Sequence, residues 1–267
     1  MNLRIKDYLD ILIPGVKAAS AAILEIYNRE FQVYYKSDHS PVTDADKVSS
    51  DILMECLEKT GENIISEEVS APSYIDRARK PVWLVDPLDG TKEFIKGNDE
   101  FCIAIARVDE KGKSEFGLIV DVVNAKAMFG GEEYGTFISS IHNFNPLKID
   151  LLVPGDTANI INSHSRLHPR AFQMQAKIHQ ANLNSTVLQK GSALKFFDLA
   201  NDVAHIYPRF GPTMEWDIAS GQAIYEGVGG EVLEISTFES LRYNKKDLFN
   251  PGFIAKPKHL SLEKFYE

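Results

Sequence analysis

Two short apolar runs in this chain are each followed directly by acidic residues, and this pattern constrains the fold more than any other feature. Ile64-Ile65 precedes Glu67-Glu68, and Trp83-Leu84-Val85 precedes Asp86 and Asp89. Apolar runs of this length, bounded by polar residues, predict buried strands. An open α/β sheet binds its ligands outside the carboxyl ends of its strands. The sequence therefore predicts an α/β protein with an acidic site at one edge of a sheet.

The rest of the chain alternates between helical and extended patterns. We expect helices over residues 5–28 (interrupted at Pro14), 44–59, 169–181, 192–199 and 217–225. We expect strands over residues 63–66, 81–85, 101–108, 116–123, 158–162 and 204–207. Near residue 149 the order changes to a regular alternation of strands and helices. We therefore expect two lobes, an α+β lobe over residues 1–148 and an α/β lobe over residues 149–267.

Composition excludes several classes of protein. Hydrophobic residues make up 44% and charged residues 25% of the 267 positions, as in an ordinary globular chain. No run approaches the roughly 18 apolar residues of a membrane span. A net charge of −9 with interspersed signs argues against a nucleic-acid surface. Cys56 and Cys102 have no metal or redox spacing and fit unpaired core thiols in a reducing compartment, which we take to be the cytoplasm.

Acidic residues at element boundaries suit a metal site. Asp217, at the start of a predicted helix, adds a third position to Glu67 and the segment Asp86–Asp89. Oxygen ligands without neighbouring Cys or His pairs select Mg²⁺ or Mn²⁺ over Zn²⁺. We expect Pro87 to fix a turn that brings the two aspartates together and aims the Leu88 carbonyl at the same point. Each acidic group alone has an ordinary alternative as a solvated pair, a turn start or a helix cap.

Two stretches resemble the signatures of the inositol monophosphatase superfamily of Li⁺-sensitive, Mg²⁺-dependent phosphatases. They are Trp83–Thr91 and Glu215–Gly221. The continuation Lys92-Glu93-Phe94 resembles the 3'(2'),5'-bisphosphate nucleotidases of this superfamily rather than its inositol phosphatases. Residues 40–46, 191–196, 207–217 and 243–251 also resemble that group. The resemblance covers most of the chain and implies a two-lobed αβαβα sandwich.

The resemblance also implies a role for each matching residue. Two or three Mg²⁺ ions would be held by Glu67, Asp86, the Leu88 carbonyl, Asp89 and Asp217. Asp46 and Thr91 would orient the attacking water and take its proton. Glu68 would be either a direct ligand or a neighbour of Glu67.

Substrate contacts are implied in the same way. They would come from Gly90, Thr91, Ser192, Lys195, Arg209, Asp217 and His164, with Ser163 and Ser165 beside the histidine. Lys195 and Arg209 would bind a second, non-reacting phosphate. The ordinary alternatives are a solvated helix lysine for Lys195 and a surface-loop histidine for His164.

The activity implied is hydrolysis of the 3'-phosphate of adenosine 3',5'-bisphosphate to AMP and phosphate, with 3'-phosphoadenylyl sulfate as a further substrate. Such a reaction would serve sulfur assimilation and nucleotide recycling. The alternatives are an inositol or fructose phosphatase, or a regulatory binding protein that has lost catalysis. Lys92-Glu93 and the pair Lys195 and Arg209 argue against the first alternative. The presence of all five acidic positions argues against the second.

Some properties leave no signal in the sequence. These are the oligomeric state, monomer or homodimer, and peripheral association with the inner face of a membrane. Residues 128–150 depart from the family pattern, and we expect any effect of this segment to fall on substrate preference rather than on the metal ligands.

Overall fold

The computed structural model describes residues 3–153, 155, 157–164, 169–180 and 184–261. Its helices are α1 (Leu3–Tyr27), α2 (Asp44–Glu58), α3 (Tyr74–Arg77), α4 (Thr91–Lys96), α5 (Pro169–Gln180), α6 (Lys195–Ala200) and α7 (Ala219–Glu226), with a 3-10 turn η1 (Glu215–Asp217). Among these described residues, none forms a helix that is both long and apolar enough to cross a membrane.

A seven-stranded sheet lies in the first half of the chain, in the order β3-β4-β5-β6-β7-β8-β9. Its strands are β3 (Asn63–Ser66), β4 (Val82–Asp89), β5 (Cys102–Val108), β6 (Ser114–Asp121), β7 (Lys126–Gly131), β8 (Gly135–Ser140) and β9 (Leu147–Lys148). The β3–β4 pair is parallel, and every other neighbouring pair in this sheet is antiparallel. A separate hairpin is formed by β1 (Val33–Tyr35) and β2 (Pro41–Thr43).

Smaller sheets make up the second half. They contain the parallel pair β10 (Ile160–Asn162) and β11 (Val187–Gln189), the sheet of β12 (Tyr207–Arg209), β16 (Phe253–Pro257) and β14 (Gly230–Glu234), and the pair β13 (Thr213–Met214) and β15 (Phe249–Asn250). A parallel bridge between Ile160 and Ile206 connects β10 to the segment that leads into β12.

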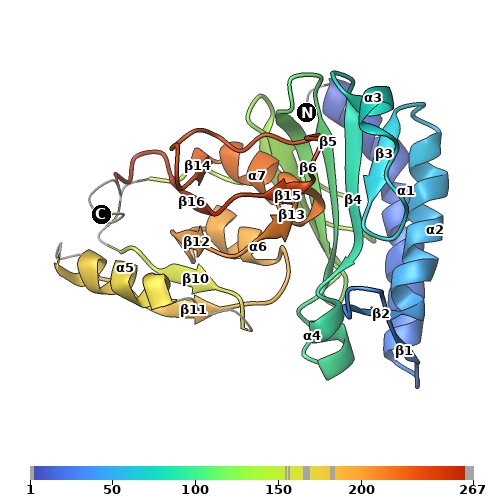
Figure 1. Ribbon diagram of the computed structural model, residues 1–267, viewed down its shortest axis with the longest axis horizontal. Helices are drawn as coiled ribbons and strands as arrows, with labels where there is room; N and C mark the ends of the chain where they lie inside the picture. The colour runs from blue at the N-terminus through green and yellow to red at the C-terminus, as the bar shows by residue number, and fades with distance from the viewer. Residues whose placement is uncertain (1–2, 154, 156, 165–168, 181–183, 262–267) are drawn as a thin grey trace.

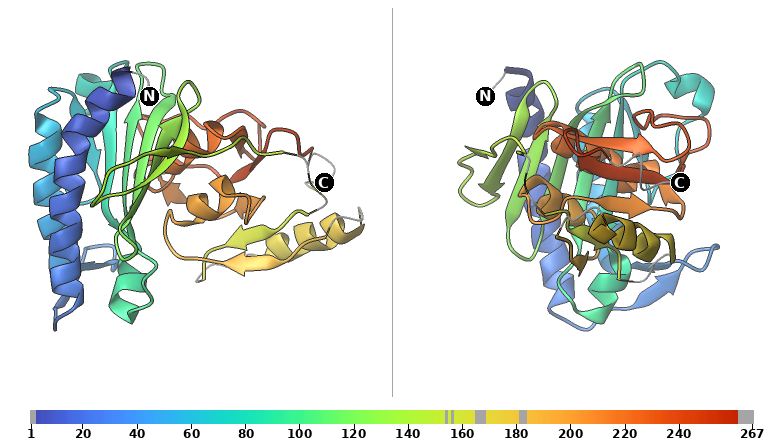
Figure 2. Two further views of the ribbon diagram at one scale, coloured as in Figure 1. Left: turned by 180° about the vertical axis from the view of Figure 1, so that it is seen from behind. Right: turned by 90° about the vertical axis from the view of Figure 1, so that its left-hand side faces the viewer.

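Figures 1 and 2 show these elements as five layers. Helices α1 and α2 cover the outer face of the seven-stranded sheet, and α6 and α7 cover its inner face. The sheets β10–β11 and β12–β16–β14 form the fourth layer, and α5 packs on them through Met174 and Ile178, which belong to one apolar cluster with Ile160 and Ile254. The expected αβαβα sandwich is confirmed.

Both faces of the large sheet are buried, because each is covered by helices. In β5, Ile103 and Ile105 face the α1–α2 layer, whereas Ala104 and Ala106 face the α6–α7 layer. The apolar side chains of α1 at three- and four-residue spacing are all buried, which accounts for its position on the sheet.

Helix α7 lies unusually close to the sheet. A Cβ on Gly117 of β6 would stand 2.1 Å from the carbonyl oxygen of Ser220, and one on Gly221 would stand 2.0 Å from the ring of Phe196. Neither distance is compatible with a side chain, so these two glycines permit the close approach. Because η1 directly precedes α7, this packing fixes the end of the chain segment that carries Asp217.

Several expected boundaries were wrong. The region 5–28, expected to form one kinked helix or two, is the single helix Leu3–Tyr27, which contains Pro14. The helix expected from Ser192 begins at Lys195, because Ser192 has a left-handed φ of 50°. The strand expected at residues 204–207 is Tyr207–Arg209, where the chain pairs with β16. Ala181, the expected end of α5, lies outside the described residues.

The expected turn at Pro87 was also wrong. Strand β4 continues to Asp89, and its pairing with β5 shifts register between Asp86 and Asp89. This irregularity has the character of a β-bulge, in which extra residues on one strand redirect its side chains. The division into lobes at residue 148 remains a proposal, since the apolar cluster between the large sheet and α7 contains residues from both halves.

Candidate active site

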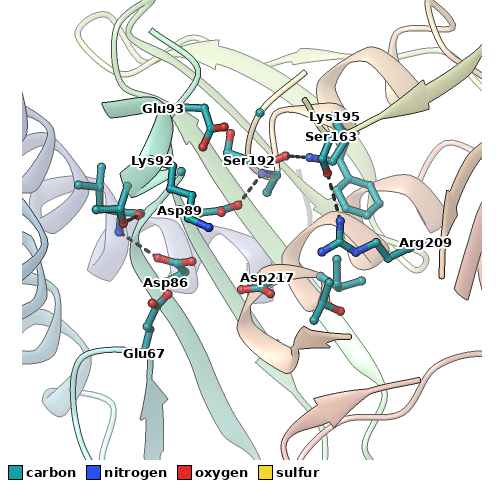
Figure 3. Close-up of a pocket in the computed structure, with 18 of the residues that line it drawn as sticks. Glu67, Asp86, Asp89, Lys92, Glu93, Ser163, Ser192, Lys195, Arg209 and Asp217 are labelled. Carbon is teal, nitrogen blue, oxygen red and sulfur yellow. Dashed lines mark hydrogen bonds between the residues drawn. The ribbon is translucent and has the colours of Figure 1, made fainter. Parts of the chain in front are cut away.

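Acidic side chains from three separate segments meet where β3, β4 and η1 come together (Figure 3). Carboxylate oxygens of Glu67, Asp86 and Asp217 lie within 4.8 Å of one another. Asp89, at the end of β4, lines the same cavity, which has a volume of about 250 Å³. We call these four residues the acidic cluster. The structure thus brings together all four carboxylates that the sequence predicted as metal ligands.

The backbone of β4 accounts for the placement of its two aspartates. Asp86 accepts a hydrogen bond from the backbone N–H of Leu88 at 3.0 Å, which holds its carboxylate inside the bulge. Gly90 follows with a φ of 100°, and a Cβ there would lie 2.9 Å from the carbonyl oxygen of Glu100. Only glycine fits this conformation and this space. Helix α4 then begins at Thr91, directly beside the carboxylates.

Burial and mutual repulsion make the acidic cluster unfavourable as a set of free anions. Burial, with the charges of Glu67 and Asp89, raises the pKa of Asp86 well above its usual value. Burial also raises the pKa of Asp89 to about 6, against the opposing effect of Lys195. Burial, with Asp89 and Glu67, raises the pKa of Asp217 to about 8. Bound cations would remove this cost.

The donor set fits Mg²⁺. Every side chain in the acidic cluster offers oxygen, and Leu88, whose carbonyl was predicted to be a ligand, also lines the cavity. Hard divalent cations prefer carboxylate and carbonyl oxygens. The residues present therefore suit the metal that the sequence predicts, and Figure 3 shows Glu67, Asp86, Asp89 and Asp217 gathered in the cavity.

Asp46 and Thr91 form a hydrogen-bonded pair next to the acidic cluster. The Thr91 hydroxyl donates to Asp46 Oδ1 at 2.8 Å, and the other carboxylate oxygen accepts from the Thr43 N–H at 2.6 Å. Asp46 is also the third residue of α2, where it completes a capping box with Thr43. Burial raises the pKa of Asp46 despite these hydrogen bonds. The pair combines a proton acceptor with a hydroxyl that fixes its orientation.

Lys36, in the hairpin that joins β1 to β2, was missed by the sequence analysis. Its ammonium group contacts Glu67 at 3.0 Å and Glu68 at 2.7 Å. Burial disfavours the charged form of Lys36, but the two carboxylates outweigh this effect and raise its pKa. Burial raises the pKa of Glu68. Its carboxylate accepts a hydrogen bond from Lys36, and the residue does not line the cavity. A lysine in a polar loop carries no sequence signal of such a contact.

The opposite side of the cavity carries positive charge. Lys195 is 5% exposed, and its Nζ donates to the carbonyl oxygen of Ser192. Arg209 Nη1 donates to the Ser163 hydroxyl at 3.2 Å. Within the described part of the chain, Arg209 Nε is buried without a hydrogen-bond partner. We call Lys195 and Arg209 the cationic wall; the burial of Lys195 contradicts its alternative interpretation as a solvated helix residue.

His164 lies beside the cavity rather than in its lining. Its Nε2 is 2.6 Å from Glu100 Oε2, whereas the preceding Ser163 does line the cavity. Ser165, expected to share a substrate contact with His164, lies outside the described residues. The cavity lining contains no residue from the atypical segment 128–150. Both cysteines are free and buried, as predicted.

Asp89 connects the two sides of the cavity. Its Oδ2 accepts a hydrogen bond from the Ala193 N–H at 2.5 Å. Ala193 belongs to the segment between β11 and α6, which also contributes Gly191 and Ser192 to the cavity lining. One carboxylate of the acidic cluster therefore also holds the backbone that carries the neighbouring substrate-contact candidates.

Comparisons with known proteins agree with this geometry. The model of the inositol monophosphatase family matches residues 6–266. The 3'(2'),5'-bisphosphate nucleotidase CysQ of Shigella flexneri is 34% identical over 256 residues, covering 92% of this chain and 98% of the relative. A crystal structure of CysQ from Bacteroides thetaiotaomicron, 33% identical, superposes with a TM-score of 0.84 and covers 97% of this chain and 100% of that one.

A more distant solved structure shares the fold alone. An IMPase from Thermotoga maritima is 20% identical and has a TM-score of 0.76, covering 97% of this chain and 96% of the other. The family model spans nearly the whole chain, and the segments it spans include every member of the acidic cluster. The chain therefore belongs to the inositol monophosphatase family.

Proposed function

We propose that this protein is a Mg²⁺-dependent phosphatase that converts adenosine 3',5'-bisphosphate to AMP and phosphate. The observation that carries the proposal is one cavity with an acidic cluster on one side and the cationic wall on the other. A substrate with two separate phosphates matches this division, because one phosphate reacts while the other is bound. The relative named 3'(2'),5'-bisphosphate nucleotidase CysQ supports the same substrate.

The acidic cluster would hold the metal ions, with the Leu88 carbonyl as a further oxygen ligand. Bound Mg²⁺ would neutralise charge on the reacting phosphate and make the attacking water more acidic. The chain itself supplies the proton acceptor. Asp46, held by the Thr91 hydroxyl at 2.8 Å, would take the water proton as the water oxygen forms its bond to phosphorus. The bond between phosphorus and the ribose 3'-oxygen breaks, and that oxygen leaves as part of AMP and takes up a proton from a solvent water molecule.

The cationic wall would bind the 5'-phosphate. A guanidinium group matches phosphate oxygens in a bidentate manner, and the unpaired Nε of Arg209 offers a donor for one of them. Lys195 would act as a buried point charge. The same wall would accept the phosphosulfate of 3'-phosphoadenylyl sulfate, which carries negative charge at the same position. Two free thiols support a reducing location, and we place the enzyme in the cytoplasm.

A substrate comparison tests the proposal. Phosphate release from adenosine 3',5'-bisphosphate should exceed release from inositol 1-phosphate and fructose 1,6-bisphosphate, and EDTA should abolish it. Inositol phosphate hydrolysed at least as fast as the nucleotide would overturn the substrate assignment. Mg²⁺-independent release would overturn the metal assignment.

Arg209→Ala tests the role of the cationic wall. Loss of hydrogen bonds to a charged group costs about 1.5 to 3 kcal/mol, so the KM for the bisphosphate should rise by roughly 10- to 100-fold. The KM for adenosine 3'-monophosphate should change little, because it lacks the second phosphate. Arg242→Ala, at an exposed arginine, is the control. An equal loss on both substrates would remove Arg209 from this role.

A further inference from the structure

We propose that Glu100 is a positioning residue that sets the cationic side of the cavity relative to the acidic cluster. The inference rests on the proposed function for the identity of the substrate, whereas the contacts of Glu100 are independent of that function. Glu100 does not line the cavity. It lies in the segment that joins α4 to β5, and one of its carboxylate oxygens connects two other segments of the chain.

The oxygen concerned is Oε2. It accepts a hydrogen bond from the Gly191 N–H at 2.6 Å and lies 2.6 Å from His164 Nε2. A carboxylate accepts but does not donate, so the imidazole supplies a hydrogen at Nε2. Hydrogen bonds to an ionised carboxylate are about twice as strong as neutral ones. One side chain from the first half of the molecule therefore holds two segments of the second half.

Both of these segments contribute to the cavity. Gly191 begins the stretch that continues through Ser192 to Lys195, and His164 directly follows Ser163, which accepts a hydrogen bond from Arg209. Lys195 is thus connected to Glu100 through the backbone of residues 191–195, and Arg209 is connected to it through Ser163 and the adjoining His164.

The backbone at Gly191 is closely packed against the segments that carry Glu93 and Glu100. A Cβ there would lie 2.9 Å from the carbonyl oxygen of Glu100 and 2.6 Å from Cγ of Glu93. Only glycine permits this approach, and the approach is what allows the N–H to reach the carboxylate. The second anchor of this stretch is Asp89, which accepts from the Ala193 N–H.

Glu100 is itself held firmly. The Tyr27 hydroxyl donates to Asp99 Oδ1 at 2.7 Å and accepts from the Asp99 N–H at 3.3 Å, which ties the segment to α1. Phe101 packs against Tyr27 and Phe94 with ring centroids 4.8 and 5.1 Å apart. A rigid support of this kind is what a positioning residue requires, because displacement of a binding group by about 1 Å is sufficient to weaken a site.

The role predicts which kinetic constant changes. Glu100→Ala should raise the KM for adenosine 3',5'-bisphosphate by about tenfold, the effect of losing one hydrogen bond between the displaced cationic wall and the 5'-phosphate. The kcat for the bisphosphate should stay within about twofold of the wild-type value, because the chemical step does not depend on the cationic wall. The kcat and KM for adenosine 3'-monophosphate should also stay within about twofold, because this substrate has no second phosphate for the cationic wall to bind. Glu100→Gln keeps the shape and one acceptor oxygen, and should give a smaller increase. Glu110→Ala, at an exposed glutamate of the β5–β6 turn, is the control.

Hydrogen exchange separates this inference from the proposed function. The Gly191 amide should exchange faster in Glu100→Ala than in the wild type and should be unchanged in Glu110→Ala, whatever the enzyme hydrolyses. Unchanged exchange at Gly191 together with an unchanged KM would overturn the inference. Equal losses on both nucleotides with reduced thermal stability would also overturn it, since they would indicate a purely structural role. A wild type that prefers inositol phosphate would overturn the proposed function alone.

Discussion

The acidic cluster should destabilise the metal-free protein as the pH rises, and removing one carboxylate should relieve this effect. Burial, with the charges of Asp89 and Glu67, raises the pKa of Asp217 to about 8, compared with about 3.9 in an unfolded chain. The folded state therefore binds this proton more tightly than the unfolded state does. The stability gained from that proton is complete below about pH 4 and is lost as the pH rises through 8.

The size of the effect follows from the pKa difference. A rise of about four units corresponds to roughly 5 kcal/mol. Asp217 is partly exposed, and its repulsion is shared with its neighbours, so we expect about 2 kcal/mol of this to be measurable. Asp217→Asn removes the charge but keeps an oxygen that can accept the hydrogen bond now donated by the Met214 N–H at 2.8 Å. The stability gained by removing the repulsion between Asp217 and its acidic neighbours should therefore exceed any stability lost through the weaker hydrogen bond to the Met214 N–H.

Urea unfolding in EDTA measures this difference. At pH 8.5 the variant should be more stable than the wild type by about 2 kcal/mol, and the difference should shrink towards pH 4.5. Excess Mg²⁺ should reverse the order, since a ligand that binds only the folded state stabilises it. Asp51→Asn, at an exposed carboxylate of α2, is the control. A wild type and variant with the same pH dependence in EDTA would refute the reasoning.

Two further substitutions test catalysis and packing. Thr91→Ala should lower kcat by about a hundredfold with little change in KM, because Asp46 loses the hydroxyl that orients it. Thr91→Ser keeps a hydroxyl and should keep most of the activity. Steady-state kinetics in which the serine and alanine variants had equally low kcat would contradict this prediction. Gly221→Ala should lower the free energy of unfolding by about 3 kcal/mol, because its Cβ would overlap the Phe196 ring. Gly211→Ala, where a Cβ meets open space, is the packing control, and equal urea midpoints for the two alanine variants would contradict the argument.

The sequence predicted the acidic cluster because its members stand beside element boundaries that apolar patterns reveal. Glu67 follows β3, and Asp86 and Asp89 lie in the C-terminal half of β4, so their convergence follows from parallel pairing of two strands. The backbone conformation between the two aspartates could not be predicted from the sequence. Asp-Pro is typical of turns, but the pairing of Asp86 with Ala104 and of Asp89 with Cys102 keeps the segment in the sheet.

Contacts between distant segments could not be predicted from the sequence alone. Glu100 precedes an apolar strand as many surface glutamates do, and its contact with Gly191 depends on how the two halves of the molecule pack. Lys36 lies in a polar loop, and its contacts with Glu67 and Glu68 depend on the position of the β1–β2 hairpin. Local patterns determine elements, whereas these contacts are set by tertiary packing.

The acidic cluster also has a consequence for how the protein is made. A ribosome produces Glu67, Asp86 and Asp89 well before Asp217, Lys195 and Arg209. Contacts between residues so far apart in sequence form late, after the intervening chain has closed. A stalled nascent chain that stops short of η1 would display three carboxylates without the fourth. Phosphatase activity should therefore be absent from such chains and arise only once η1 docks against the sheet.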